Sequence, residues 1–413
     1  MMNIAVLGYG TVGSGVVEIV NTKHAYILGR SSEADLNVKY ILDLRDFPGD
    51  PNEDKVTHDF NDILNDDSVR IVAEAMGGTK PAFEFTAKLL EAGKHVVTSN
   101  KELVATHGLE LLKIAKEHNV NYMFEASVGG GIPLLRPLSY CLAANEIQAI
   151  NGILNGTTNF ILSKMINENL TFEEALEIAQ ANGYAEADPT ADVEGIDACR
   201  KICILADLAF GANVDPAKVH AEGITKITLE DVAYANNCGS VIKLVGTAKR
   251  LPDGKAYITV SPAIVRSGSQ LAAVSDVFNG VLINGDNVGD VFFYGPGAGK
   301  LPTASAVVAD IIDCANHDEK RKMLGWGPEV DGMVADYREV PNEYYIRLKV
   351  ENPAEAQQEI RDAFGKIYLL ARSGAYNTEL AFITAPFTEN EVRAKLDSLH
   401  SVKLKSLIRV ADC

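Results

Sequence analysis

The sequence predicts an α/β fold: a Rossmann-type doubly wound parallel sheet, an α+β domain, and a C-terminal ferredoxin-like βαββαβ module. Three observations support this prediction. Short apolar runs alternate with helical patterns up to about residue 128. A glycine-rich turn joins the first of these runs to the next helix. Residues 343–413 repeat strand and helix patterns in the order βαββαβ.

The first strand is expected over residues 3–7, and a G-x-G-x-x-G turn follows it. The second glycine of such a turn lets the backbone approach a pyrophosphate, and the third lets helix and strand pack closely. The following helix N-terminus adds N–H donors and partial positive charge. The turn therefore predicts dinucleotide binding, the alternative being a tight turn with no ligand. The cofactor contacts expected here are Gly8, Gly10, Thr11, Val12 and Gly13.

The second strand, expected over residues 38–44, leaves the choice of cofactor open. An acidic residue at its end would hold the ribose 2′-hydroxyl of NAD, and a nearby arginine would accept the 2′-phosphate of NADP. The chain offers both, as Asp43 and Arg45. We take Arg45 as a cofactor contact and favour NADP, although the spacing does not decide between the two.

The remaining elements of this sheet are strands over 69–78, 95–101 and 121–128, with helices over 81–93 and 109–118. The strand over 95–101 ends in Ser99, Asn100 and Lys101. Because the carboxyl ends of parallel strands line the ligand crevice, these side chains are expected at the cofactor. Lys101 is well placed to meet an anionic or carbonyl group, the alternative being a solvated lysine at a helix start.

The stretch GYAEADPTADVEGIDACRK, residues 183–201, gathers five carboxylates before an apolar helix. Pro189 interrupts any long helix, so the acids are expected on a loop, with the next helix beginning near residue 195 or 196. Asp197 then lies in the first turn, four residues before Lys201 and on the same face. In a cleft, the carboxylates could hold an ammonium group while Lys201 exchanges a proton with a carbonyl oxygen. The alternative is an exposed acidic loop with an ordinary surface ion pair.

Composition excludes several classes. The net charge of −18, without a run of five Lys or Arg residues, argues against nucleic acid. No stretch reaches the ~18 apolar residues of a membrane span. The N-terminus does not have the pattern of a signal peptide. The six cysteines do not form a disulfide framework in a chain of 413 residues. We expect a cytoplasmic protein.

The stretch 183–201 resembles the signature of homoserine dehydrogenases, G-Y-A-E-x-D-P-x-x-D-x-x-G-x-D-x-x-x-K. SNK, FEASVGGGIP, LNGTTNFIL and GPGAGKLPTASAVV also resemble that family, in the family's order, so the resemblance covers about residues 1–320. It implies reversible, NAD(P)-dependent hydride transfer between L-aspartate 4-semialdehyde and L-homoserine, in the threonine, methionine and isoleucine biosynthetic branch.

The resemblance also implies roles for individual residues. Lys201 is expected to be the acid/base at the aldehyde oxygen, with Lys101 beside it. The substrate contacts implied are Glu186, Asp192, Asp197, Thr157 and Tyr184. Gly183 and Gly299 are expected near the cofactor. A monovalent cation, expected to be sodium, would be bound by main-chain oxygens of Glu125, Val128, Gly130 and Ile132.

The C-terminal module resembles an ACT domain, which implies threonine as a regulator. Its turn ENPAEAQQEI lacks the glycine usual in that fold, so a role in assembly alone is the alternative. A homodimer or homotetramer is expected. The domains expected are nucleotide-binding (1–128 and 300–322), catalytic and dimerisation (129–299), a linker (323–342), and ACT-like regulatory (343–413).

The same residues bear on three alternative functions. A phosphorylating semialdehyde dehydrogenase needs a nucleophilic cysteine with a base nearby, and none of the six cysteines has that setting. An amino-acid dehydrogenase is a further alternative. A non-catalytic nucleotide and amino-acid sensor would not need the lysines of SNK and DACRK.

Overall fold

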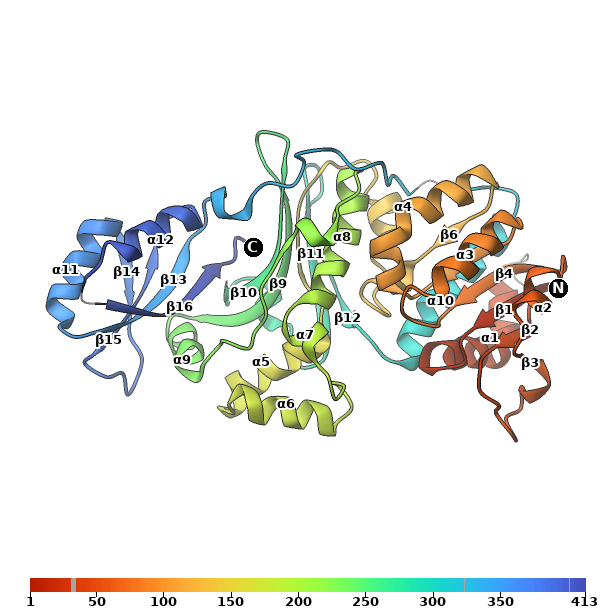
Figure 1. Ribbon diagram of the computed structural model, residues 1–413, viewed down its shortest axis with the longest axis horizontal. Helices are drawn as coiled ribbons and strands as arrows, with labels where there is room; N and C mark the ends of the chain where they lie inside the picture. The colour runs from red at the N-terminus through yellow and green to blue at the C-terminus, as the bar shows by residue number, and fades with distance from the viewer. Residues whose placement is uncertain (31–34, 323, 401) are drawn as a thin grey trace. The chain divides into compact units, whose positions relative to one another are not determined.

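The computed structural model describes residues 1–30, 35–322, 324–400 and 402–413 (Figure 1). Within these ranges the chain divides into two compact units. Unit 1 comprises Met1–Ala144, Cys203–Pro216 and Gly295–Glu329, and unit 2 comprises Asn145–Ile202, Ala217–Tyr294 and Val330–Cys413.

Unit 1 is built on a parallel sheet with the strand order β3-β2-β1-β4-β5-β6, which confirms the predicted Rossmann-type sheet. Its strands are β1 (Met2–Leu7), β2 (Leu36–Leu42), β3 (Val56–Thr57), β4 (Val69–Glu74), β5 (His95–Thr98) and β6 (Tyr122–Met123). The strand order reverses between β1 and β4. Ligands of such sheets bind at this switch point, outside the carboxyl ends of the strands.

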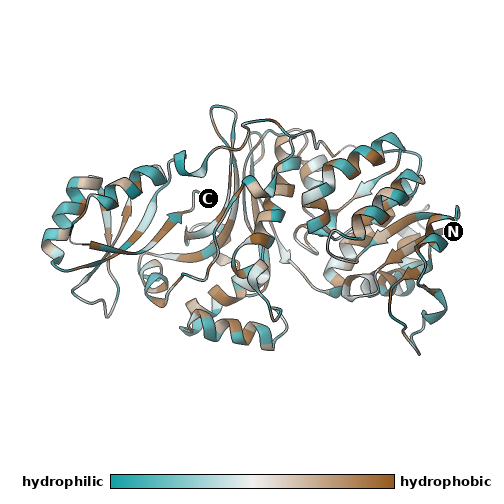
Figure 2. Cartoon of the chain, in the orientation of Figure 1, coloured by the Kyte–Doolittle hydropathy of each residue, from teal (hydrophilic) through white to brown (hydrophobic). Residues whose placement is uncertain are grey.

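Helices cover both faces of this sheet. They are α1 (Thr11–Arg30), α2 (Phe60–Leu64), α3 (Ala82–Glu91), α4 (Lys101–Glu117) and α10 (Lys300–Asn316). Figure 1 shows α1 beside α10 on one face and α3 beside α4 on the other. The central strands are therefore buried on both sides, and residues 4–7 of β1 are fully buried. Figure 2 shows hydrophobic residues concentrated along these strands.

Two elements of unit 1 differ from the sequence prediction. Helix α4 begins at Lys101, eight residues before the expected start at 109, because the Asn100 side chain accepts a hydrogen bond from the Leu103 N–H and caps it. The strand expected over 121–128 is confined to β6. The chain then turns through a 3₁₀ helix at Glu125–Ser127, since the Glu125 N–H bonds a side chain of α10 instead of a neighbouring strand.

Unit 2 contains a mixed sheet in the order β12-β11-β7-β9-β10-β16-β13-β15-β14, with β8 also paired to β10. The strands are β7 (Ile147–Ile153), β8 (His220–Ala221), β9 (Ser240–Arg250), β10 (Ala256–Arg266), β11 (Phe278–Gly285), β12 (Gly289–Pro296), β13 (Tyr344–Val350), β14 (Ile367–Leu370), β15 (Glu379–Thr384) and β16 (Val402–Val410). The antiparallel strands predicted between 240 and 295 are confirmed by the pairing of β9 with β10 and β7 with β11.

The helices of unit 2 are α5 (Gly156–Glu168), α6 (Phe172–Ala181), α7 (Thr190–Val193), α9 (Leu229–Asn237), α11 (Pro353–Phe364) and α12 (Glu389–Asp397). The division between the units passes through α8 (Ile196–Phe210). This helix begins where the sequence predicts. The short helix α7 within the acid-rich loop was not predicted.

The C-terminal elements β13-α11-β14-β15-α12-β16 have the predicted βαββαβ order, and their strands lie in the spatial order β16-β13-β15-β14. Strand β16 also pairs in parallel with β10, through Ala263 with Arg409 and Ile264 with Val410. One sheet therefore continues from the middle of the chain into this module. Position 323, in the expected linker, lies outside the described residues, whereas Val334 forms a bridge with Ala256.

A buried ion pair fixes this module to helix α9. The Arg347 guanidinium on β13 donates to the Asp231 carboxylate at 2.8 Å and to the Thr228 hydroxyl at 2.9 Å. Asp231 is fully buried, so this pairing offsets the cost of burying a carboxylate.

We expect Arg347→Ala to lower the free energy of unfolding by about 3–5 kcal/mol, because it leaves a buried carboxylate without its cation. Urea unfolding followed by circular dichroism measures the change. Lys349→Ala, at an exposed position on the same strand, is the control and should change stability by less than about 0.5 kcal/mol. Equal effects of the two substitutions would contradict the assigned role of the pair.

Candidate active site

The three glycines after β1 are constrained in different ways. A Cβ on Gly8, whose φ is +90°, would lie 2.9 Å from the Ala75 carbonyl oxygen, and one on Gly13 would lie 1.8 Å from the Gly8 oxygen. A Cβ on Gly10 would meet no protein atom within 4 Å. Protein packing thus requires Gly8 and Gly13. At Gly10 it leaves open space beside the start of α1, which suits the approach of a phosphate group.

Asp43 and Arg45 lie together beside this turn. The Asp43 carboxylate accepts the Tyr9 N–H at 2.8 Å and two guanidinium bonds from Arg45, at 2.9 and 3.0 Å. The Arg45 guanidinium holds the pKa of Asp43 well below its usual range. The Arg45 side chain is 62% exposed, so it can meet an anion while it stays paired.

The residues after β5 are held by side-chain hydrogen bonds. Asn100, which is buried, donates from its Nδ2 to the Gly78 carbonyl at 2.7 Å, and its own N–H bonds the Thr98 hydroxyl at 2.9 Å. Ser99 precedes it, and Lys101 is the first residue of α4. These predicted residues therefore sit where a sheet strand ends, as expected.

Gly299 lies at the start of α10, on a turn packed against the GGGI segment. Its φ of +118° favours glycine. A Cβ on Gly130 would lie 2.4 Å from the Gly297 oxygen, and one on Gly131 would lie 2.8 Å from Pro302. The two turns thus meet backbone to backbone, which only glycine permits.

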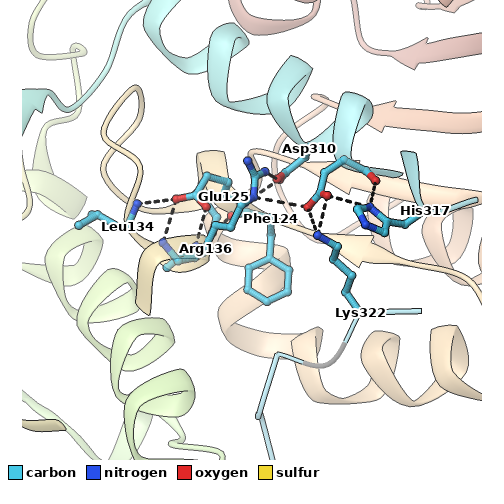
Figure 3. Close-up of polar contacts among 10 residues, drawn as sticks. Phe124, Glu125, Leu134, Arg136, Asp310, His317 and Lys322 are labelled. Carbon is cyan, nitrogen blue, oxygen red and sulfur yellow. Dashed lines mark hydrogen bonds and ion pairs between the residues drawn. The ribbon is translucent and has the colours of Figure 1, made fainter. Parts of the chain in front are cut away.

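Figure 3 shows the polar network that shapes the segment from Glu125 onward. The Glu125 carboxylate accepts the N–H groups of Leu134, Leu135 and Arg136 at 2.6–2.8 Å. The Glu125 N–H donates to the fully buried Asp310 carboxylate at 2.8 Å, and the Arg136 guanidinium pairs with the same carboxylate. Burial raises the pKa of Asp310 to about 7.

Three carbonyl oxygens of this segment suit a cation. Val128, Gly130 and Ile132 are buried, and among the described residues their carbonyls accept no hydrogen bond. Buried carbonyls normally have a partner. The described part of the chain holds no group of three or more His, Cys, Asp or Glu side chains able to bind a metal. A cation here would be bound mainly by main-chain oxygens, because the Glu125 carboxylate is occupied by N–H groups.

In unit 2, Lys201 lies on helix α8 (Ile196–Phe210), just after the acid-rich loop, and its side chain is buried among polar groups. The Lys201 ammonium donates to the Leu154 carbonyl and to the Asp197 carboxylate, both at 2.8 Å. Lys201 is 8% exposed and Asp197 is 2% exposed. This ion pair is therefore buried, and the expectation of an ordinary surface pair is wrong.

Asn155, which the sequence reasoning missed, joins the carboxylates of this site. Its Nδ2 donates to Asp192 at 2.7 Å and to Asp197 at 2.9 Å, while its Oδ1 caps helix α5 through the Thr158 N–H at 2.8 Å. The sequence signal for Asn155 as a helix N-cap was its position directly before Gly156 and Thr157, which begin helix α5.

Thr157 and Tyr184 also come together, because the Thr157 hydroxyl donates to the Tyr184 carbonyl at 2.6 Å. Glu186 is exposed on the same loop. Gly183 ends helix α6 with a φ of +72°. Lys101 and Lys201 belong to different units.

Two family models match the chain: "Homoserine dehydrogenase, NAD binding domain" over residues 8–125 and "Homoserine dehydrogenase" over 133–312. The homoserine dehydrogenase of Bacillus subtilis is 39% identical over 376 residues, covering 88% of this chain and 85% of that protein. The chain belongs to the homoserine dehydrogenase family. It is an NAD(P)-dependent oxidoreductase that transfers a hydride reversibly between L-aspartate 4-semialdehyde and L-homoserine.

Similarity to other homoserine dehydrogenases supports this assignment. The enzyme of Synechocystis is 45% identical over 323 residues, covering 76% of this chain and 73% of that protein. The crystal structure from Thiobacillus denitrificans matches with a TM-score of 0.88 and 34% identity, covering 100% of this chain and 98% of that one. A hyperthermophilic archaeal homoserine dehydrogenase in complex with NADPH matches with a TM-score of 0.65 and 30% identity, covering 76% of this chain and 97% of that one.

Within the described ranges, no helix has the length and apolar character needed to cross a membrane.

The different surroundings of Gly10 and Gly13 predict different effects of substituting each glycine by alanine. Gly10→Ala should leave the unfolding transition close to that of the natural protein but weaken NADPH and NADH binding, because the new methyl occupies only the open space. Gly13→Ala should destabilise the fold itself, because its Cβ would overlap the Gly8 oxygen. Thermal unfolding and cofactor fluorescence titration separate the two. Similar losses of stability in both variants would contradict this assignment.

Proposed function

We propose that Lys201 is the general acid/base of the reaction. The observation that carries this proposal is its buried ammonium group, held by one carbonyl and one carboxylate at 2.8 Å. These two acceptors fix the position of Nζ within the polar site.

The chemistry follows from the charge that develops. The nicotinamide cofactor, when bound, supplies or accepts the hydride. As the aldehyde carbon is reduced, negative charge grows on its oxygen, and the Lys201 ammonium stabilises that charge and donates a proton. In the reverse direction Lys201 receives the hydroxyl proton of homoserine. Asp197 and the Leu154 carbonyl keep Nζ in place in both directions.

The substrate is an amino acid, so its ammonium group needs carboxylates. We assign Glu186 and Asp197 to the amino group and hydroxyl end of the substrate, with Asp192 supporting them. Thr157 and Tyr184 complete the substrate contacts. Lys101 positions substrate and cofactor at the end of β5. The support is the linked set of acids around Asn155 and the hydrogen bond from Thr157 to Tyr184.

We infer that NADP is the preferred cofactor. The exposed Arg45 offers a guanidinium for a 2′-phosphate, and Asp43 is already occupied by Arg45 and Tyr9. The cofactor contacts proposed are Gly8, Gly10, Thr11, Val12, Gly13, Arg45, Ser99, Asn100, Lys101, Gly183 and Gly299.

We also propose a monovalent cation, sodium, at the main-chain oxygens of Glu125, Val128, Gly130 and Ile132. The support is that the carbonyls of Val128, Gly130 and Ile132 are buried and accept no hydrogen bond from any residue that the structure describes. Such a cation would rigidify the turn that packs on Gly297 and Pro302, close to the start of α10.

We propose a cytoplasmic homodimer or homotetramer whose C-terminal module, residues 343–413, is an ACT-like regulatory domain that responds to threonine. Its βαββαβ order supports this proposal. The nucleotide-binding domain would be 1–128 and 300–322, and the catalytic and dimerisation domain 129–299, joined to the module by 323–342.

We expect Lys201→Met to lower kcat by about 10²–10⁴-fold, the usual cost of losing a general acid/base, with little change in NADPH binding. Absorbance at 340 nm during homoserine oxidation measures the rate. Lys164→Met removes a lysine from a surface pair with Glu168 on α5 and serves as the control. Turnover near that of the control would rule out the role of Lys201.

We expect Arg45→Ala to lower kcat/KM for NADP about 10- to 100-fold, the scale of one charge-assisted hydrogen bond. The value for NAD should stay unchanged or rise, because Asp43 becomes available to the ribose hydroxyl. The ratio of the two values, measured with homoserine, reports the switch. Lys23→Ala, on the exposed side of α1, is the control, and an unchanged ratio in Arg45→Ala would refute the assignment.

A further inference from the structure

One buried carboxylate lies at the switch point of the unit 1 sheet without a role so far. Glu74 is the last residue of β4 and is fully buried. It follows three apolar residues, Ile71–Ala73, in the same strand. Buried carboxylates are costly unless their oxygens accept hydrogen bonds.

Both oxygens of Glu74 accept hydrogen bonds from neutral groups. Oε1 accepts the Met76 N–H at 2.7 Å, and Oε2 accepts the Thr98 hydroxyl at 2.6 Å. The Thr98 oxygen in turn accepts the Asn100 N–H at 2.9 Å. Burial raises the pKa of Glu74. Through these hydrogen bonds, Glu74 links the turn after β4 to the turn after β5.

The same contacts extend to the glycine turn after β1. A Cβ on Gly8 would lie 2.9 Å from the Ala75 oxygen and 3.1 Å from Met76 Cα, so the turn that Glu74 holds is in close contact with the glycine turn. On the other side, the Asn100 Nδ2 donates to the Gly78 carbonyl at 2.7 Å. The ends of β1, β4 and β5, which border the cofactor crevice, thus share one buried anchor.

We propose that Glu74 is a positioning residue for the dinucleotide: through Met76 and Thr98 it sets the two turns that, with the glycine turn, receive the cofactor. This inference rests on the proposed cofactor site at Ser99, Asn100 and Lys101. Glu74 acts through backbone and hydroxyl groups and does not itself touch the cofactor.

The chemistry requires a carboxylate and not merely a polar group of the same size. Each oxygen faces a hydrogen: the N–H of Met76 on one side and the O–H of Thr98 on the other. A glutamine would place its NH₂ against one of them. Facing Met76 it sets donor against donor, and facing Thr98 it can no longer accept the hydroxyl hydrogen. Glu74→Gln therefore removes one link without changing volume.

The test uses the full chain and titrates NADPH by its fluorescence, with homoserine kinetics at saturating cofactor. Glu74→Gln and Thr98→Val should each raise the NADPH Kd about fivefold or more, on the scale of one lost hydrogen bond. The KM for homoserine should stay within twofold. The NADPH Kd of the double variant should be no higher than the higher of the two single-variant values, because both substitutions disrupt the same set of hydrogen bonds through Glu74.

The matched control is Thr86→Val. Thr86 lies on α3 in the same unit, is as buried as Thr98, and its hydroxyl has no hydrogen-bond partner among the described residues. It should leave the NADPH Kd within twofold. If Glu74→Gln and Thr98→Val bind NADPH as Thr86→Val does, the positioning role is refuted. If Glu74→Gln fails to fold, Thr98→Val against Thr86→Val decides alone. A failure of the natural protein to oxidise homoserine would refute the proposed function instead, independently of these Kd values.

Discussion

The proposed chemistry of this protein depends on keeping one ammonium group buried among polar partners. A buried charge is tolerated only when it is paired and hydrogen-bonded, and Lys201 meets both conditions through Asp197 and the Leu154 carbonyl. Asp197 in turn depends on Asn155, which also binds Asp192. The proposed roles explain the acid-rich loop: Asp197 compensates the charge of Lys201, and the other carboxylates are assigned to the ammonium group of the substrate.

The sequence predicted those parts whose signals are local. The glycine turn, the start of α8 after Pro189 and the βαββαβ order each follow from a few adjacent residues, and the structure has all three. The buried pair of Asp197 and Lys201 was indicated by spacing alone, but its burial was not, because burial depends on β7 and α5 packing nearby.

The parts that could not be predicted depend on partners distant in the chain. Glu125 and Asp310 are 185 residues apart, and no local pattern indicates that an N–H of one meets the carboxylate of the other. For this reason the prediction of a strand over 121–128 was wrong beyond β6, which covers only Tyr122–Met123. Glu74 and Asn155 read as an ordinary strand end and an ordinary helix cap. Their second partners, at Thr98 and Asp197, become visible only once the sheets have formed.

Glu74 and Glu125 solve the same physical problem. A turn that binds a ligand through its own backbone cannot also use those backbone groups to hold its shape. A buried carboxylate can hold it from outside, by accepting hydrogen bonds from N–H or O–H groups of neighbouring residues. Glu125 does this through residues 134–136, and within the described part of the chain the carbonyls of Val128, Gly130 and Ile132 accept no hydrogen bond. Glu74 does it through Met76 and Thr98. Both acids are thus buried beside glycine-rich turns whose shape they hold from outside, which is consistent with the ligand sites proposed there.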